Sequence, residues 1–175
     1  MSGAYRPPQP LDERHRLARF TCRSSEQSDW LRRFARQSAS TGTTGTTKVF
    51  VVTEPGHDEV VAYYAWCMAQ IHTSDAPQRL RKGGGRYPQP VALLAHLGVH
   101  VDHEGRGLGA TLLRDVLARL AELSEDIGCR GLLVHAESAQ ARGFYLHLLP
   151  ELEPSPTDDL HLVLLMQDIR RTLGS

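Results

Sequence analysis

The sequence lacks the marks of a membrane-inserted or disulfide-bonded protein. No run of 18 or more apolar residues occurs in the 175-residue chain, so no spanning helix is expected. The opening stretch MSGAYRPPQP has no apolar core like that of a signal peptide, and we expect a flexible leader over residues 1–10. The three cysteines are widely spaced and form no CxxC pair, which argues against a disulfide framework and a structural zinc site. These absences favour a cytoplasmic protein. The length of 175 residues favours one domain, over residues 11–175.

Metal ligands at a recognisable spacing are also missing. His96, His100 and His103 lie close together in a chain with nine histidines. His96 and His100 could share one face of a strand, but no third ligand stands at a spacing typical of a metal site. His96 and His100 also fit the polar face of a strand, in alternation with apolar residues. We therefore expect no bound metal.

A strong net charge is absent too, but the charges are distributed unevenly. Residues 1–90 carry 13 basic and 8 acidic side chains, whereas residues 91–175 carry 7 and 12. Eighteen of the 20 basic residues are arginine, which can bind phosphate through two parallel hydrogen bonds. The isoelectric point of about 7.1 lacks the basic signature of many nucleic-acid-binding proteins. Composition therefore permits a nucleic acid partner without indicating one.

Apolar periodicity predicts an α+β fold with a mixed, mostly antiparallel central sheet flanked by helices. Helices are expected at 24–40, from 108 to a stop at Gly128, and at 138–149 with a cap at Ser138. Strands are expected at 48–53, 60–71, 91–101, 131–136 and 160–166. Residues 41–47 are expected to form a flexible link, 74–90 an irregular insertion and 150–159 a loop. The strand, helix and strand between 91 and 136 predict one βαβ crossover.

The stretch HEGRGLGATLL, residues 103–113, places three glycines within five positions directly before a predicted helix. Glycine in a helix costs up to about 1 kcal/mol relative to alanine, so this much backbone freedom needs a reason. Exposed backbone N–H groups at the start of a helix bind anions, most often phosphate. This glycine loop is therefore a candidate phosphate site.

Three phosphate motifs and an unoccupied tight turn compete for this loop. The stretch GTTGTTK does not match a Walker A motif, because Thr47 stands where glycine is required. A dinucleotide fingerprint is satisfied by Gly105, Gly107 and Ala110, but antiparallel strands precede the loop and only about 65 residues follow it. A pyrophosphate loop for coenzyme A suits a strand, glycine turn and helix within a mostly antiparallel sheet.

The chain resembles the GNAT acyltransferase family over most of its length. The phosphate loop of that family follows the pattern [Q/R]xxGx[G/A], and residues 104–109 match both of its required small positions, at Gly107 and Gly109. Glu104 stands where the family usually has Gln or Arg. A carboxylate beside a pyrophosphate is electrostatically unfavourable unless it points away.

The resemblance extends to the toxins of bacterial type II toxin–antitoxin modules that acetylate aminoacyl-tRNA. Their opening pattern, roughly FxCGxxxLDxWLrxxA, is similar to FTCRSSEQSDWLRRFA here, with Arg23 in place of the glycine and Ser28 in place of the first leucine. VVAYYA, ESAQARGFY and the tail from residue 152 are also similar to elements of those toxins. LHLLPEL replaces the FGF element that usually follows the tyrosine.

The resemblance implies the GNAT fold and transfer of an acetyl group from acetyl-CoA to an amine, without a metal. Strand residues 97–101 would pair with the pantetheine arm, and the loop would hold the pyrophosphate. The implied cofactor-binding residues are Leu97, Val99, Val101, Glu104, Gly105, Arg106, Gly107, Leu108, Gly109, Ala110 and Ser138. Tyr145 would protonate the departing thiolate, or at least donate a hydrogen bond to it, while Phe144 is expected in the core. No residue stands out as a general base.

The same resemblance implies aminoacyl-tRNA as the acceptor, a ribbon-helix-helix antitoxin, a homodimer, and operator DNA bound only through the antitoxin. The basic residues that could meet RNA phosphates are Arg32, Arg33, Arg36, Arg79, Arg81, Lys82 and Arg86. Two other functions stay open: a GNAT enzyme for another amine, such as a protein N-terminus or small molecule, and a catalytically silent binding or repressor subunit.

Overall fold

The computed structural model describes residues 5–40 and 45–174 of the chain. Within them, strands join in one sheet in the order β1-β2-β3-β4-β5-β7-β6, accompanied by helices. The strands are β1 (Gln9–Pro10), β2 (Lys48–Val52), β3 (Ala62–Ile71), β4 (Gln89–Val99), β5 (Gly131–His135), β6 (Glu153–Pro154) and β7 (His161–Leu165). The helices are α1 (Ser25–Arg33), α2 (Ala35–Ala39), α3 (Gln78–Arg81), α4 (Leu108–Leu123), α5 (Ala139–Leu148) and α6 (Met166–Gly174), with 3-10 turns η1 (Thr73–Asp75) and η2 (Val101–His103). The predicted α+β class is confirmed.

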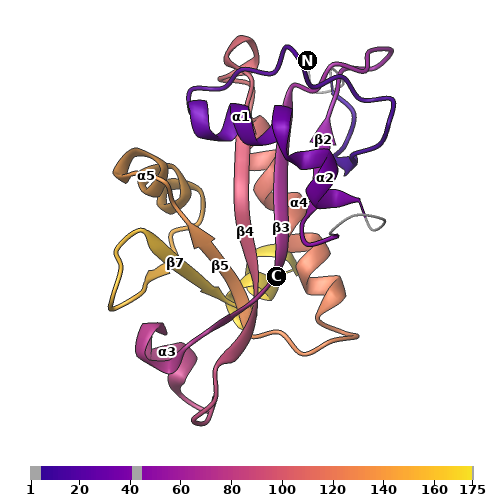
Figure 1. Ribbon diagram of the computed structural model, residues 1–175. Helices are drawn as coiled ribbons and strands as arrows, with labels where there is room; N and C mark the ends of the chain where they lie inside the picture. The colour runs from indigo at the N-terminus through magenta and orange to yellow at the C-terminus, as the bar shows by residue number, and fades with distance from the viewer. Residues whose placement is uncertain (1–4, 41–44, 175) are drawn as a thin grey trace. The chain divides into compact units, whose positions relative to one another are not determined.

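The chain forms two compact units, residues 1–67 with 95–115 and residues 68–94 with 116–175. In the first unit, α1 and α2 pack on β2 and β3 (Figure 1). The core of this packing is formed by Leu17, Phe20, Cys22, Leu31, Ala35, Val49, Val51, Val60, Tyr63 and Ala65. β1, within the predicted leader, pairs antiparallel with β2.

The predicted helix over 24–40 is interrupted at Phe34. Ser24 caps α1, since its side chain accepts a hydrogen bond from the N–H of Gln27. Phe34 adopts a φ of −118°, which ends α1 and precedes α2. Leu31 and Ala35 are buried, whereas Phe34 is 51% exposed. Part of the predicted flexible link, residues 41–44, lies outside the described residues.

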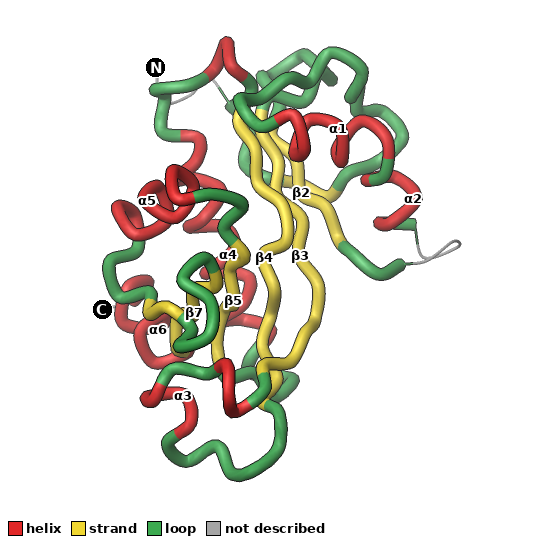
Figure 2. Tube along the Cα trace, turned by 60° about the vertical axis from the view of Figure 1, so that its left-hand side comes forward, coloured by secondary structure: helices red, strands yellow, loops and turns green. Residues whose placement is uncertain are grey.

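In the second unit, β5 pairs antiparallel with β7, and α6 lies against both strands (Figure 2). The apolar core there contains Ile71, Ala76, Leu80, Val91, Leu133, Val163 and Leu165. The apolar pattern did not predict α6, because its first residue directly continues the apolar run of β7 with no turn residue between them. The insertion also contains α3, and the loop 150–159 contains β6.

The predicted βαβ crossover is confirmed by β4 and β5, which pair in parallel and are connected through α4. Leu108, Leu112, Val116 and Leu120 of α4 are all buried, as the helical spacing predicts. α4 ends at Leu123, before the predicted stop at Gly128. β4 ends at Val99, so the predicted strand to residue 101 is too long. None of the described helices is long and apolar enough to cross a membrane.

Candidate functional site

The glycine loop forms the turn between η2 and α4. Gly105 and Gly107 have φ values of 75° and 80°, in the left-handed region that favours glycine. A Cβ built on either of them meets no heavy atom within 4 Å, so the backbone conformation rather than crowding requires glycine. Gly105, Arg106 and Gly107 are exposed. The turn therefore presents bare backbone to solvent at the start of a long helix.

The backbone donors of this loop are available to a ligand. Within the part of the chain that the structure describes, the N–H groups of residues 105–110 make no hydrogen bond. The first donor used is Thr111, whose N–H binds the carbonyl of Gly107 at 3.0 Å. Leu108, Gly109 and Ala110 thus begin α4 with free N–H groups, where the helix dipole is positive. This arrangement suits a phosphate or pyrophosphate group.

The Arg106 side chain is held beside the loop by the N-terminal segment. Its Nη1 donates to the Tyr5 hydroxyl at 2.9 Å, and the same hydroxyl lies 2.8 Å from Nδ1 of His103. Because arginine can only donate, the Tyr5 oxygen accepts from Arg106 and its proton can go to neutral His103. Burial lowers the pKa of His103, which favours this neutral form. Tyr5 thereby connects two residues that flank the turn.

Glu104, the departure from the family pattern, forms an ion pair. Nε of Arg23 donates to its two carboxylate oxygens at 2.8 and 3.0 Å. The hydrogen bond to Glu104 raises the pKa of Arg23. The negative charge at the head of the loop is therefore partly neutralised by a residue far away in the sequence.

The strand residues expected beside the pantetheine arm are only partly in a strand. Leu97 and Val99 lie on β4, whereas Val101 lies in η2 and is 41% exposed. The parallel register of β4 with β5 covers Ala92–Leu94, and β4 continues beyond it to Val99.

Tyr145 lies on α5, which begins at Ala139 after its cap residue Ser138. The Ser138 hydroxyl accepts from the N–H of Ala141 at 3.1 Å and caps the helix, as predicted. The Tyr145 side chain is 7% exposed, and burial together with the charge of Glu137 raises its pKa. The phenol is thus protonated at neutral pH. Phe144 is 37% exposed, so its predicted place in the core is wrong.

The Tyr145 hydroxyl has no hydrogen-bond partner among residues 5–40 and 45–174. Burial of the phenol keeps it protonated at neutral pH. A protonated hydroxyl that makes no hydrogen bond to the described residues suits a proton donor.

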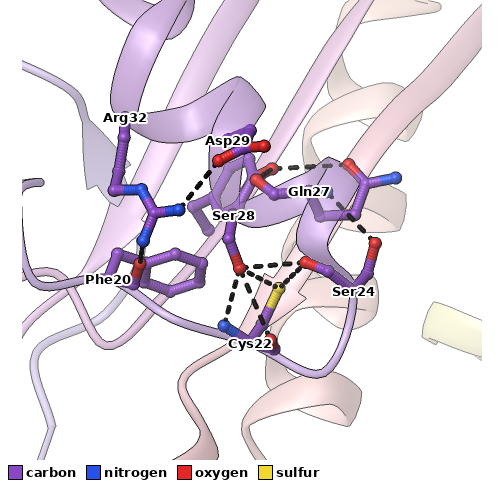
Figure 3. Close-up of polar contacts among 8 residues, drawn as sticks. Phe20, Cys22, Ser24, Gln27, Ser28, Asp29 and Arg32 are labelled. Atoms are coloured by element: carbon purple, nitrogen blue, oxygen red, sulfur yellow. Dashed lines mark hydrogen bonds and ion pairs between the residues drawn. The ribbon is translucent and has the colours of Figure 1, made fainter.

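Two of the three arginines proposed for RNA contact on the first helices are engaged within the protein. Arg32 donates to the Phe20 carbonyl and to Asp29, both at 2.8 Å (Figure 3). Arg36 donates to the carbonyls of Asp12 and His15. Arg33 is exposed and makes no such contact with the described residues.

Figure 3 also shows how the start of α1 is fixed. The Ser28 hydroxyl accepts from the N–H of Cys22 at 2.9 Å and donates to the Ser24 carbonyl at 2.9 Å. Ser28, a departure from the toxin pattern, therefore joins the segment before the helix to its first turn.

The basic residues of the insertion also include one that is bound within the protein and others that are not. Arg79 donates to Glu153 at 2.7 Å and to Asp168 at 2.8 Å. Arg81, Lys82 and Arg86 are exposed, and their side chains make no ion pair or hydrogen bond to other described residues. The latter three keep their charge available to an anionic partner.

The clustered histidines make ring contacts and hydrogen bonds within the protein. His96 stacks on Trp30 with ring centroids 4.0 Å apart, and its Nδ1 lies 2.7 Å from Oε1 of Gln27. Nδ1 of His100 accepts from the N–H of Asp102. Across residues 5–40 and 45–174, no group of three or more His, Cys, Asp or Glu side chains is placed to hold a metal ion.

Tyr5 and Arg23 at the loop were not predicted from the sequence. Tyr5 falls in a segment that composition assigns to a leader, and only the fold brings it to His103. A signal for Arg23 did exist, because Arg23 and Glu104 are both departures from the family patterns.

The comparisons with known proteins agree with this geometry. The acetyltransferase (GNAT) family profile matches residues 13–149. A "tRNA-acetylating toxin" of Mycobacterium tuberculosis is 37% identical over 174 residues, which cover 99% of both chains.

Two solved structures share the fold. AtaT complexed with acetyl-methionyl-tRNAfMet has a TM-score of 0.84 at 19% identity, covering 97% of this chain and 99% of that one. A mutant AtaT bound to the C-terminus of the antitoxin AtaR and acetyl-CoA has a TM-score of 0.80 at 18% identity, covering 98% and 99%. With a family profile over most of its length and a full-length relative, this chain belongs to the GNAT acetyltransferase family.

Proposed function

We propose that this chain is the toxin of a type II toxin–antitoxin module and acetylates the α-amino group of an aminoacyl-tRNA, with acetyl-CoA as donor. The strongest support is the combination of the free N–H groups at residues 105–110 with a full-length relative named as a tRNA-acetylating toxin. The acetylated amine can no longer form a peptide bond, so translation stops. The reaction takes place in the cytoplasm, where charged tRNA is found.

The glycine loop would bind the pyrophosphate of acetyl-CoA. The N–H groups of residues 105–110 would donate to its oxygens, and Arg106 would add a positive charge held in place by Tyr5. The backbone of Leu97 and Val99, beyond the β5 register, would pair with the pantetheine arm as an added strand does. No role is proposed for Val101 in that pairing, because it lies outside the strand.

Transfer needs few groups from the protein. The neutral α-amine, with a pKa near 8, attacks the thioester carbonyl carbon, and the carbon–sulfur bond breaks. Tyr145 donates its hydroxyl proton to the departing thiolate, and the proton lost by the amine returns to the phenolate through solvent. The raised pKa of Tyr145 keeps the phenol protonated before the reaction. Ser138 would act indirectly, as the cap of the helix that carries Tyr145.

RNA contact is assigned to the basic residues whose side chains make no ion pair or hydrogen bond to the described residues. These are Arg33 on α1 and Arg81, Lys82 and Arg86 in the insertion. Arg32, Arg36 and Arg79 are bound to carbonyls or carboxylates, and so contribute less to an RNA phosphate site. Binding through phosphates predicts a steep decrease in affinity with salt.

The proposed partners follow from the same assignment. They are a ribbon-helix-helix antitoxin whose tail covers the active site, a second copy of the chain in a homodimer, and operator DNA reached only through the antitoxin. The leader over residues 1–10 and the single acetyltransferase domain over 11–175 also stay predictions.

An acetyl-transfer assay tests the proposal. Purified protein is mixed with labelled acetyl-CoA and a pool of charged tRNAs, in parallel with Tyr145→Phe. We expect label on the aminoacyl group with the wild type and a loss of at least about 100-fold with the variant, because a general acid contributes on this scale. Uncharged tRNA, which lacks the amine, should stay unlabelled.

The matched control is Tyr87→Phe, which removes a hydroxyl from a side chain that is 81% exposed. It should transfer acetyl groups as the wild type does. Absence of label on every charged tRNA, with acetyl-CoA still bound, would contradict the substrate and direct the search to other amines.

A further inference from the structure

Two departures from the family patterns meet at the glycine loop. Arg23 occupies a position where the toxin pattern has glycine, and Glu104 one where the loop pattern has Gln or Arg. They are 81 positions apart, yet Nε of Arg23 lies 2.8 Å from one oxygen of Glu104 and 3.0 Å from the other. The positive charge that is missing at the head of the loop is thus supplied from another segment.

The ion pair uses only a small part of the arginine. A guanidinium group has five N–H donors, of which the single Nε–H is shared between the two carboxylate oxygens. The two terminal nitrogens, with four N–H donors, make no hydrogen bond to the described residues. The Arg23 side chain is 74% exposed, against 31% for Glu104. The two terminal nitrogens of the planar guanidinium group therefore stay open to solvent.

An open guanidinium edge suits phosphate, since its terminal N–H groups match two phosphate oxygens. Glu104 fixes the orientation of that edge, and Arg23 cancels a charge that would repel an anion bound to residues 105–110. An ordinary exposed ion pair would contribute little by itself. Because this pair lies beside the free N–H groups of residues 105–110, it is placed to assist anion binding rather than to stabilise the fold.

We propose that Arg23 binds a phosphate group of acetyl-CoA and that Glu104 positions it for this contact. The proposal rests on the proposed function only in that the loop holds the pyrophosphate of acetyl-CoA. Arg23 then takes the place of the side chain that the family usually carries at the first position of the loop.

Calorimetric titration of acetyl-CoA into the full-length wild type, Arg23→Ala, Glu104→Gln and the double variant tests this. We expect Arg23→Ala to bind about tenfold more weakly, the scale of one charge-assisted hydrogen-bonded contact. Glu104→Gln should stay within about threefold of the wild type, because it removes the repulsive charge together with the positioning. The double variant should bind about tenfold more weakly than Glu104→Gln, because the arginine contact is lost in both backgrounds.

The double variant distinguishes direct contact of Arg23 with phosphate from mere neutralisation of the Glu104 charge. If Arg23 only cancelled the charge of Glu104, the double variant would bind as tightly as Glu104→Gln, and the proposal would be wrong. Equal affinity of Arg23→Ala and the wild type would also overturn it. Arg14→Ala, which breaks the exposed pair of Arg14 with Asp12 in the same unit, is the matched control and should bind as the wild type does.

A parallel titration with uncharged tRNA distinguishes the source of the phosphate. Arg23→Ala should bind tRNA as the wild type does. Weaker tRNA binding with unchanged acetyl-CoA affinity would assign the guanidinium to an RNA phosphate and overturn the proposal. Failure of the wild type to bind acetyl-CoA would remove the proposed function as well, whereas failure of the variant pattern alone leaves that function standing.

Discussion

Gly107 has a φ of 80°, and a Cβ built on it meets no heavy atom within 4 Å. Gly143, within α5, has equal space but no positive φ. Gly107→Ala should therefore lower the free energy of unfolding by about 1–2 kcal/mol, the cost of left-handed backbone for a residue with a Cβ. Gly143→Ala should raise it by about 0.5–1 kcal/mol, because alanine is the better helix former. Urea unfolding of the two variants measures both changes, and effects of the same sign would contradict the interpretation.

Single residues were predicted from the sequence where a local pattern fixes them. The run of glycines before a helix indicated the loop, and the family pattern indicated Tyr145. The contact between Arg23 and Glu104 could not be predicted from local patterns, because residues 81 positions apart are brought together only by the tertiary fold. The exposure of Phe144 was missed for a related reason, since helical spacing alone does not say which side of a short helix faces the core.

At the scale of elements, α5 depends on its cap. Ser138→Ala removes the acceptor for the N–H of Ala141 and should lower the free energy of unfolding by about 1 kcal/mol. Ser138→Asp keeps an acceptor at the cap and should stay close to the wild type. Thermal unfolding followed by circular dichroism checks the pair. Equal losses in both variants would show that the hydroxyl has a role other than capping.

The insertion gives a second prediction at this scale, because its arginines have two roles. Arg79 contacts Asp168, whose side chain is 1% exposed, and the hydrogen bond to Asp168 raises the pKa of Arg79. Arg79→Ala leaves that buried carboxylate with one cation fewer. We expect its urea midpoint to fall below that of Arg170→Ala, the control that breaks an exposed pair with Glu125.

Replacing Arg81, Lys82 and Arg86 by alanine should instead leave the urea midpoint unchanged and weaken tRNA binding, with a shallower dependence on salt. Unchanged tRNA affinity in this triple variant would remove the insertion from the RNA site.

Most elements were predicted where the apolar period was regular and turn residues bounded it. The four buried residues of α4, one turn apart, are the clearest case. The predicted ends of elements were wrong where tertiary contacts, rather than the local sequence, determine them. β4 ends at Val99 because η2 begins shortly after it, and α6 begins immediately after β7 without a break in the apolar pattern.

At the scale of the whole molecule, stability should fall in weak acid. The His15 side chain is 1% exposed and its Nδ1 accepts from the N–H of Asp12 at 2.9 Å, so the ring is held neutral. Burial lowers the pKa of His15, and the same cause lowers the pKa of His103. Below about pH 6.5 the unfolded chain therefore binds more protons than the folded chain. The stability from these neutral rings is present above about pH 6.5 and is lost as the pH falls.

Urea unfolding at about pH 7.5 and pH 5.5 measures this loss. We expect a smaller difference between the two pH values in His15→Gln than in the wild type. His57→Gln, at an exposed histidine, should keep the wild-type difference. If His15→Gln kept the full difference, burial of this ring would not be its source.

The pair of Arg23 and Glu104 also constrains the order in which such a loop can arise. A glutamate placed first would put an unbalanced charge beside the bound anion, so an ancestor with that change alone would lose affinity for its donor. An arginine placed first adds only an attractive charge, and a later glutamate can then accept from it. Acquiring Arg23 before Glu104 therefore keeps donor binding intact at each step, whereas acquiring Glu104 first produces an intermediate enzyme that binds its donor more weakly. Relatives with arginine but no glutamate should therefore exist, and relatives with the glutamate alone should be rare.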